Sequence, residues 1–255
     1  MNVVKIMGGL GNQFFQYALA RGLATYSPVG IDISFYASKD NNNGVFIPRE
    51  FGLHRFNCTI NLADYDLNTQ EITENIFDPE QRYQDCNFWG WWQRTKYFDY
   101  ANIYKDLQKD LILKEEYLKD NVMRIVDEMN NCNSVAIHVR RTDYVKMNWQ
   151  TDVYYYVRAK EKMDELVKDP KYYVFSDNID WCYDNLPFKG ARFIHCRDFE
   201  DFHIMQHAKH NIIANSTFSW WAAYTNKNKN IVVAPKGWIS GIEWSPLSVK
   251  GWILV

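Results

Sequence analysis

The sequence lacks a strong charge of either sign. Its 255 residues contain 29 Lys and Arg against 31 Asp and Glu, a formal net charge of -2. No stretch gathers the basic residues, so the electrostatic surface of a general nucleic-acid-binding protein is missing. A hydrophobic content of 47% with 24% charged residues is that of a globular chain, and it excludes a disordered or collagen-like one.

The chain also lacks paired cysteines and long apolar runs. Its five cysteines are widely spread, with no Cys-x-x-Cys pair and no histidine at zinc-ligand spacing, which argues against disulfides and structural zinc. The apolar run after Met1 is too short for a signal peptide, and no run approaches the roughly 18 residues of a membrane span. We therefore expect a cytoplasmic protein without a span, and peripheral attachment to the inner membrane stays open.

Aromatic residues, in contrast, are abundant, with 17 Tyr, 15 Phe and 10 Trp. The densest cluster is Phe88-Trp89-Gly90-Trp91-Trp92. Aromatic rings stack on the apolar faces of sugars and bases, and tryptophan is seldom fully buried. We therefore give a sugar or base contact at this cluster the same weight as packing.

Hydrophobic spacing predicts an α/β protein of two domains. In the first half we expect a strand at 3–7, a glycine turn and a helix with Asn12 as its N-cap. A strand at 30–35 follows, then an irregular segment at 37–110 and a helix at 114–129. An asparagine-rich stretch ends that helix, so we place the boundary there and expect domains at 1–131 and 132–255.

The second half alternates short apolar strands with amphipathic segments. This alternation is typical of a parallel, doubly wound sheet. We expect strands at 135–139, 172–175, 192–195, 211–214 and 231–234, and helices at 153–167, 179–185, 199–209 and 218–224.

Polar residues follow every predicted strand of the second half, where ligands bind in such sheets. Taken singly, Asp177, Asp198 and Ser216 are typical helix caps. The adjacent pair Arg140 and Arg141 is harder to explain structurally, because arginine offers a fixed fork of donors that suits phosphate.

A second anion site is predicted at Asn215-Ser216-Thr217, from hydroxyls and the amides of the helix that follows. Together with the arginines it could hold a diphosphate without metal. No P-loop signature is present, which disfavours a nucleoside triphosphatase. Asp64-Tyr65-Asp66 has the pattern of metal-chelating sugar transferases, but this spacing arises easily by chance in an irregular segment, so we assign no metal site.

An alternative rests on the first glycine turn. Gly9-Leu10-Gly11 follows a strand and opens a helix, and Asp32 ends a second strand, as in the dinucleotide fingerprint. Phe14, however, stands where the third glycine or alanine should allow close packing of helix against strand. An NAD-dependent oxidoreductase and a non-catalytic sugar-binding module therefore remain as alternatives.

Five segments in order carry a resemblance to a known family. They are Gly8–Tyr17 (GGLGNQFFQY), Gly90–Gln93 (GWWQ) with Lys96–Phe98, His138–Tyr144 (HVRRTDY), Phe175–Asp177 (FSD) and Ala214–Tyr224 (ANSTFSWWAAY). Together they resemble bacterial α-1,2-fucosyltransferases of glycosyltransferase family 11. The resemblance implies a GT-B-like fold of two Rossmann-like lobes with a cleft between them. It also implies inverting, metal-independent transfer of L-fucose from GDP-fucose to a galactoside in glycan synthesis.

Single roles follow from the same resemblance. The segment at His138 is also similar to the donor motif of core α-1,6-fucosyltransferases. It implies that Arg140 holds the β-phosphate and that His138 lies beside the guanosine. Asp201 resembles the carboxylate that reads the guanine edge, and Asn12 the asparagine near the fucose and phosphate. Asn178 departs from the family, where a second aspartate is common. The predicted donor set adds Gly11, Arg141, Asp177, Asn215, Ser216, Thr217 and Ser219, and the acceptor set is Trp91, Trp92 and Gln93.

The chemistry agrees with this assignment. Breaking the fucose–GDP bond develops negative charge on the β-phosphate, so leaving-group stabilisation by Arg140, Ser216 and backbone amides is the main expected catalytic effect. Asp143 is the nearest carboxylate in sequence and could be a general base or could orient Arg140. We favour the orienting role, because a carboxylate beside two guanidiniums stays ionised and is a weak base.

Overall fold

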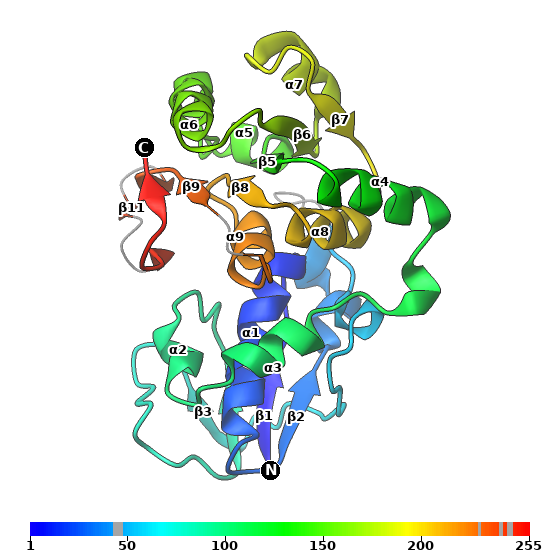
Figure 1. Cartoon of the computed structure of the whole chain (residues 1–255). Coiled ribbons are helices and arrows are strands. Elements are labelled where there is room, and N and C mark those ends of the chain that lie inside the picture. The colour runs from blue at the N-terminus through cyan, green and yellow to red at the C-terminus, as the bar shows by residue number, and fades with distance from the viewer. Residues whose placement is uncertain (43–47, 229–230, 240–241, 244–246) are drawn as a thin grey trace. The chain divides into compact units, whose positions relative to one another are not determined.

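The computed structural model describes residues 1–42, 48–228, 231–239, 242–243 and 247–255 (Figure 1). The chain divides into two compact units, Met1–Ile112 and Leu113–Val255. Residues 113–131, which the sequence analysis assigned to the first domain, belong to the second unit. Helix α4 (Asp120–Asn130) explains the difference, because it packs on helix α8 (Asp198–Gln206) of that unit.

The first unit is built on a four-stranded parallel sheet in the order β2-β1-β4-β3. Helix α1 packs against β1 and β2. Strand β4 lies inside the sheet, within the irregular segment at 37–110 for which the sequence predicted no strand. The elements are β1 (Asn2–Lys5), α1 (Leu10–Leu23), β2 (Val29–Asp32), β3 (Gln70–Ile72), β4 (Cys86–Phe88), α2 (Lys96–Asp99) and α3 (Tyr104–Asp110), with short 3-10 helices at Ser34–Ala37, Lys39–Asn42 and Leu53–Arg55.

The second unit contains a six-stranded parallel sheet in the order β12-β9-β8-β5-β6-β7. The predicted strands and helices of this half are confirmed within a few residues at their ends. A separate antiparallel pair joins β10 and β11. The elements after α4 are β5 (Ser134–Val139), α5 (Thr142–Lys146), α6 (Val153–Leu166), β6 (Lys171–Ser176), α7 (Ile179–Asn185), β7 (Arg192–Ile194), α8, β8 (His210–Ile212), α9 (Thr217–Tyr224), β9 (Val232–Ala234), β10 (Gly237–Ile239), β11 (Ile242–Glu243) and β12 (Ile253–Leu254), and a 3-10 helix at Glu115–Tyr117 precedes α4.

This strand order creates a switch point between β5 and β8. From β5 the chain proceeds to β6 and β7 on one side, and then returns to β8 on the other side. In open α/β sheets, ligands bind beyond the carboxyl ends of the strands at such a point. The loops that follow β5 and β8 are therefore the first places to look for a site.

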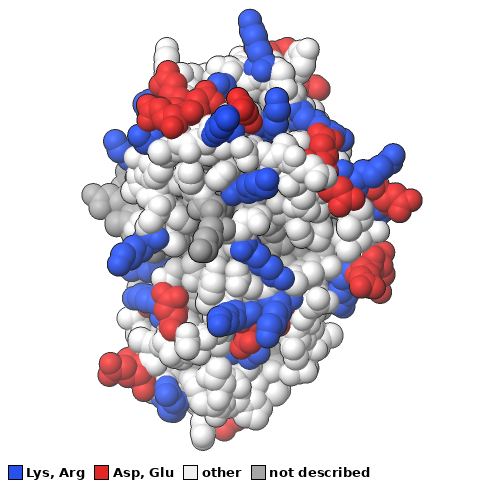
Figure 2. Space-filling view, viewed as in Figure 1, with Lys and Arg blue, Asp and Glu red and all other residues white. Residues whose placement is uncertain are grey.

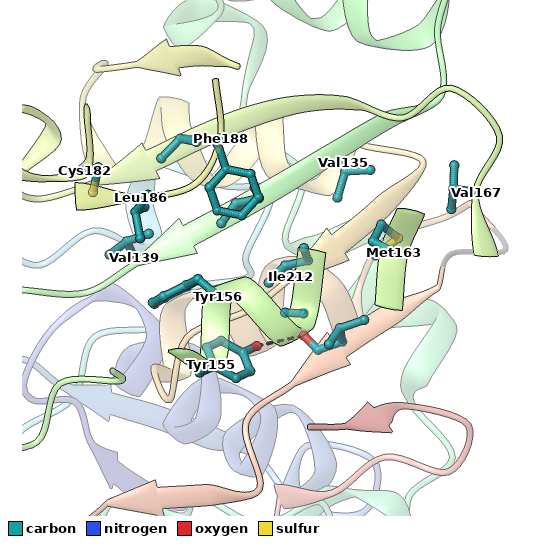
Figure 3. Close-up of a cluster of buried hydrophobic side chains, with 14 residues drawn as sticks. Val135, Val139, Tyr155, Tyr156, Met163, Val167, Cys182, Leu186, Phe188 and Ile212 are labelled. Carbon is teal, nitrogen blue, oxygen red and sulfur yellow. Dashed lines mark hydrogen bonds between the residues drawn. The ribbon is translucent and has the colours of Figure 1, made fainter. Parts of the chain in front are cut away.

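Helices α6 and α7 cover one face of this sheet through a buried hydrophobic cluster (Figure 3). Tyr155 and Tyr156 of α6 and Cys182 of α7 pack there with Val135 and Val139 of β5. The Tyr155 hydroxyl donates to a backbone carbonyl, at Ile213, 2.6 Å away. Because side chains alternate along a strand, the packing of odd-numbered β5 residues here turns His138 to the opposite face.

The surface matches the balanced composition. On the face drawn in Figure 2, Lys and Arg side chains occur at several separate places, with Asp and Glu side chains among them. Among the residues that the structure describes, none of the helices is both long enough and apolar enough to cross a membrane.

Candidate functional site

The loop after β5 brings two arginines and two aspartates together. Arg140 and Arg141 directly follow β5, and Asp177 directly follows β6. The two strands are parallel neighbours, with Val139 opposite Ser176. Their carboxyl ends therefore deliver these side chains to the same edge of the sheet, beside the switch point.

Arg140 is held between two carboxylates. Its Nη2 atom lies 2.6 Å from Oδ1 of Asp143, and its Nη1 atom lies 2.8 Å from Oδ2 of Asp177. The Arg140 Cζ atom is 5.4 Å from the centre of the Tyr144 ring, and the side chain is 17% exposed. A planar guanidinium bound at both terminal nitrogens has a fixed direction, so Arg140 is oriented before any ligand arrives.

These contacts favour the orienting role for Asp143. Besides Arg140, its Oδ1 atom accepts the backbone N–H of Tyr144 at 3.1 Å. Asp143 is buried, with 6% of its surface exposed. The Oδ1 atom is thus engaged by the Arg140 guanidinium and by the turn itself, which is the geometry of an orienting residue.

Arg141 has a different environment from Arg140. Its Cζ atom lies 3.5 Å from the centre of the Trp181 ring in α7, which is a stacked cation–π contact. Asp177 binds the same turn, because its Oδ1 atom accepts the Arg141 backbone N–H at 2.8 Å and its Oδ2 atom accepts the Thr142 hydroxyl at 2.5 Å. The two arginines thus make different contacts: Arg140 forms ion pairs with two aspartates, and Arg141 stacks on an aromatic ring.

His138 lies on the other face of β5, as the alternation requires. Its ring centre is 5.3 Å from that of Phe218 in α9. Burial lowers the pKa of His138 well below the ordinary value, so the ring is neutral. Among the residues that the structure describes, its Nδ1 atom has no hydrogen-bond partner.

Asn215 follows β8, but the protein itself uses all of its amide. Its Nδ2 atom donates to the carbonyls of Trp149 and Trp238, and its Oδ1 atom accepts the Thr151 hydroxyl at 2.9 Å. Asn215 is 4% exposed. Its contacts therefore hold loops together near the switch point, and a donor contact of Asn215 stays a prediction.

Replacing Asn215 by alanine should lower the free energy of unfolding by about 2 to 4 kcal/mol, because one buried and two partly buried hydrogen bonds, worth roughly 0.5 to 1.5 kcal/mol each, are lost. Urea titration followed by circular dichroism measures this change. Asn131→Ala is the matched control, since Asn131 is exposed and its amide donates only to the Asp127 carbonyl. Equal losses of stability in the two variants would contradict the conclusion that the hydrogen bonds of Asn215 hold these loops together.

The other polar residues of this turn differ in exposure. Ser216 is the N-cap residue of α9; it is buried, with 6% of its surface exposed, and its side chain makes no capping hydrogen bond. Thr217 begins the helix and is partly exposed. Ser219 is fully buried, and its hydroxyl donates to the Ser216 carbonyl at 3.2 Å. A direct donor contact by Ser219, as predicted, is therefore not available in this arrangement.

Asp201 is a buried acid at the start of α8. Its Oδ1 atom accepts the backbone N–H of Cys196 at 3.3 Å, and 8% of the residue is exposed. Among the described residues, its Oδ2 atom makes no hydrogen bond or ion pair. Burial raises the pKa of Asp201 to about 8. The second oxygen allows Asp201 to accept hydrogen bonds from a partner rich in N–H donors, and the raised pKa means that such binding at neutral pH releases the carboxyl proton.

In the first unit, the glycine turn places Asn12 inside the first turn of helix α1 and not at its N-cap. The N-cap of α1 is Gly9, and Asn12 lies within the first turn, so the predicted N-cap role is wrong. Asn12 Oδ1 accepts from Nε2 of Gln93 at 3.0 Å. Gly8 has φ of +77°, and a Cβ there would lie 2.9 Å from both Asn12 Nδ2 and Trp91 Cζ3. Asn12, Trp91 and Gln93 therefore gather around the turn, where only glycine fits.

The two predicted acceptor tryptophans differ in exposure. Trp91 is 43% exposed, whereas Trp92 is completely buried. Trp92 packs edge-on against Tyr97, with ring centres 5.0 Å apart. This corrects the expectation that both rings face an acceptor, because only Trp91 has a free face for stacking.

The acids of the dinucleotide and metal-binding patterns make local hydrogen bonds. Asp32 accepts the backbone N–H and the hydroxyl of Ser34, both at 2.9 Å, as a turn residue does. Asp66 accepts the backbone N–H of Asn68 at 2.9 Å. In the part of the chain that the structure describes, no three His, Cys, Asp or Glu side chains gather as metal ligands.

Two residues at these sites carried no sequence signal. Trp181 supports Arg141, and the Oε1 atom of Glu74 accepts the backbone N–H groups of Trp91 and Trp92 at 2.7 and 3.0 Å. Both contacts join residues far apart in the chain. Only a structure brings them together.

Comparison with known proteins identifies the family. Residues 1–243 match the model of glycosyl transferase family 11. The chain belongs to glycosyltransferase family 11. It is 30% identical to an α-1,2-colitosyltransferase of Escherichia coli over 278 residues, covering 94% of this chain and 93% of the relative. The O-antigen biosynthesis glycosyltransferase WbnK of Escherichia coli is 26% identical, with 97% and 98% covered.

Solved structures agree on the fold. The fucosyltransferase NodZ from Bradyrhizobium superposes with a TM-score of 0.53 at 11% identity, covering 87% of this chain and 91% of NodZ. A NodZ α-1,6-fucosyltransferase soaked with GDP-fucose gives 0.50 at 12% identity, with 88% and 91% covered. The predicted GT-B-like α/β class is confirmed, and the oxidoreductase and binding-module alternatives are wrong for a family 11 glycosyltransferase.

Proposed function

We propose that this family 11 enzyme transfers L-fucose from GDP-fucose to a galactoside hydroxyl, forming an α-1,2 linkage with inversion and without metal, in glycan synthesis. The observation that carries the proposal is the orientation of Arg140 at the carboxyl end of β5 by Asp143 and Asp177. A pre-oriented guanidinium at a sheet switch point suits a diphosphate leaving group. The second unit would hold the donor and the first unit the acceptor.

The catalytic contribution of Arg140 is electrostatic. As the bond from the sugar C1 to the β-phosphate oxygen breaks, the electron pair moves to that oxygen and the charge on GDP grows. A donor fixed in advance stabilises this charge without reorganising at the moment of reaction. Ser216 and the amides at the start of α9 would contribute in the same way, since a helix N-terminus favours anions.

The neutral ring of His138, packed against Phe218, would form an apolar wall for the base of the nucleotide. Asp201 would read the guanine edge through its free oxygen. Asn12, at the glycine turn, would lie near the fucose. These roles rest on the family's motif at matching positions and on the burial described above.

The test is a thermal-shift series with GDP, GDP-fucose, NAD and galactosides. We expect GDP and GDP-fucose to raise the melting temperature, because a ligand that binds only the folded protein stabilises it. Stabilisation by NAD without stabilisation by GDP would overturn the proposal. Transfer assays with fucosyl and colitosyl nucleotides as competing donors decide between two sugars, since one relative is an α-1,2-colitosyltransferase.

Transfer should survive removal of divalent metal. Arg140, Arg141 and the α9 amides supply the positive potential that a metal ion would otherwise bring to the diphosphate. Initial rates with and without EDTA measure this. Complete loss of activity on chelation, restored by Mn²⁺, would instead assign a ligand role to Asp64 and Asp66.

A further inference from the structure

The loop at 147–152, between α5 and α6, connects the two strand ends that flank the switch point. The Trp149 backbone N–H donates to the carbonyl of Tyr144, in the helix after β5, at 2.8 Å. The Trp149 carbonyl in turn accepts a hydrogen bond from Nδ2 of Asn215, which follows β8, at 2.7 Å. β5 and β8 are parallel neighbours, and ligands of such sheets bind in the crevice beyond the strand ends. These backbone contacts therefore hold Trp149 beside that crevice.

The side chains of Tyr144 and Trp149 form an aromatic pair next to Arg140. Their ring centres lie 5.9 Å apart at an interplanar angle of 86°, which is an edge-to-face contact. The centre of the Tyr144 ring lies 5.4 Å from Cζ of Arg140. Both aromatic residues are partly exposed, so the pair offers aromatic surface to a ligand of Arg140.

The aromatic pair lies apart from the proposed base site. The loop leads into α6, which covers one face of the sheet, whereas His138 packs on Phe218 at the opposite face. In the proposed function Arg140 holds the β-phosphate, and this phosphate joins the nucleotide to the transferred sugar. With the base directed toward His138, the sugar is the part of the donor within reach of the aromatic pair.

Aromatic rings suit one group of such a sugar. L-Fucose and colitose both carry a methyl group at C6, where L-galactose carries a hydroxymethyl group. A methyl group gains free energy when it leaves water for an aromatic surface. A hydroxyl group moved to the same place would lose its hydrogen bonds to water without an equivalent partner. Aromatic surface beside Arg140 therefore favours 6-deoxy sugars.

We propose that Tyr144 and Trp149 bind the C6 methyl group of the transferred sugar and select 6-deoxy donors, an inference that rests on the proposed function. The pair takes no part in bond breaking, which stays with Arg140 and the α9 amides. Its role is to determine donor specificity, and it holds for fucose and colitose alike because both sugars have the methyl group. One relative of this chain is an α-1,2-colitosyltransferase.

The test compares two donors that differ by one oxygen atom, GDP-fucose and GDP-L-galactose. The unaltered enzyme should prefer GDP-fucose in kcat/KM by about 10- to 100-fold, the range in which an apolar pocket discriminates against an added hydroxyl. Trp149→Ala should reduce this ratio about tenfold, through slower use of GDP-fucose. Trp149→Gln offers the added hydroxyl a hydrogen-bonding partner, so it should lower the ratio by speeding the use of GDP-L-galactose as well. Trp149→Phe and Tyr144→Phe keep aromatic rings and should keep most of the preference.

Tyr154→Ala is the matched control, because Tyr154 is an aromatic residue in the first turn of α6 with 74% of its surface exposed. It should leave both the rate and the ratio as in the unaltered enzyme. Melting temperatures monitor folding, and the backbone hydrogen bonds of Trp149 do not need its side chain. GDP affinity in calorimetry should be the same in every variant. If Trp149→Ala slowed both donors by the same factor, or weakened binding of GDP itself, the pair would act on Arg140 or on the nucleotide, and the proposal would be overturned.

Failure of the proposed function gives a different result. If the unaltered protein bound neither GDP nor GDP-fucose, the assignment of the donor and this inference would both be wrong. If the unaltered enzyme transferred fucose but used GDP-L-galactose equally well, or if Trp149→Ala and Trp149→Gln kept the original ratio, only the role of the aromatic pair would be wrong.

Discussion

Replacing Arg140 by alanine should lower kcat for fucosyl transfer by about 10² to 10³-fold, the loss seen when one donor to a developing oxyanion is removed. Arg140→Lys should be intermediate. It keeps the charge, but a single ammonium cannot reproduce the fork that Asp143 and Asp177 hold at 2.6 and 2.8 Å. Since the contact strengthens as charge develops, kcat should fall much more than donor affinity. Single-turnover rates and GDP calorimetry measure the two effects.

Arg141 is the matched control for this experiment. Its guanidinium stacks on Trp181 at 3.5 Å, so its side chain contributes mainly to packing between the turn and α7. Arg141→Lys should therefore lower the melting temperature more than it lowers the rate. If both lysine variants lost rate equally while melting temperatures stayed constant, the arginines would form a joint clamp and the division of roles would be wrong.

The second unit could be predicted well from sequence because its signals are local. Strands such as β5 are fully buried and, apart from Ser134 and His138, apolar, as expected for a parallel sheet covered on both faces, and amphipathic helices separate them. The positions of Arg140 and Asp177 follow from the strand ends alone. Their pairing required the register of β5 against β6, which no single segment contains.

The first unit was less predictable because its key features depend on distant contacts. Strand β4 is only three residues long, and it forms between β1 and β3 rather than from its own pattern. Neighbouring tryptophans look equivalent in sequence, yet the positive φ of Trp92 buries one ring and exposes the other. Glu74, which enforces that turn, lies in a separate segment.

Replacing Asp201 by asparagine should weaken GDP binding by roughly 10- to 100-fold at pH 8.5 and above. Hydrogen bonds to a charged group are worth about 1.5 to 3 kcal/mol, and the asparagine amide places a donor where the guanine edge also presents donors. ADP, which lacks that donor pattern, should bind weakly to both proteins. Calorimetry with the two nucleotides measures the change, and an equal loss for GDP and ADP would contradict base reading by Asp201.

The same residue predicts a pH dependence with a definite sign. Burial raises the pKa of Asp201 to about 8 in the folded protein, against roughly 3.9 when unfolded. Below pH 8 the carboxyl group is protonated, so binding the guanine N–H groups must release a proton. GDP affinity should rise by up to about tenfold per pH unit toward pH 8 and then level off. Asp201→Asn should remove this dependence of GDP affinity on pH. Any dependence that remains in the variant comes from titration of the phosphate, and subtracting it isolates the effect of Asp201.

Stability without nucleotide should change in the opposite direction. Between about pH 4 and pH 8 the folded protein binds a proton at Asp201 that the unfolded chain does not, so this group's contribution is complete below pH 4 and is lost as pH rises through 8. Urea unfolding across this range should show Asp201→Asn losing less stability with rising pH than the unaltered protein. Saturating GDP should offset the loss, because the ionised carboxylate then has its partner. If the free energy of unfolding changed with pH in the same way for both proteins, the proton would be bound at a group other than Asp201.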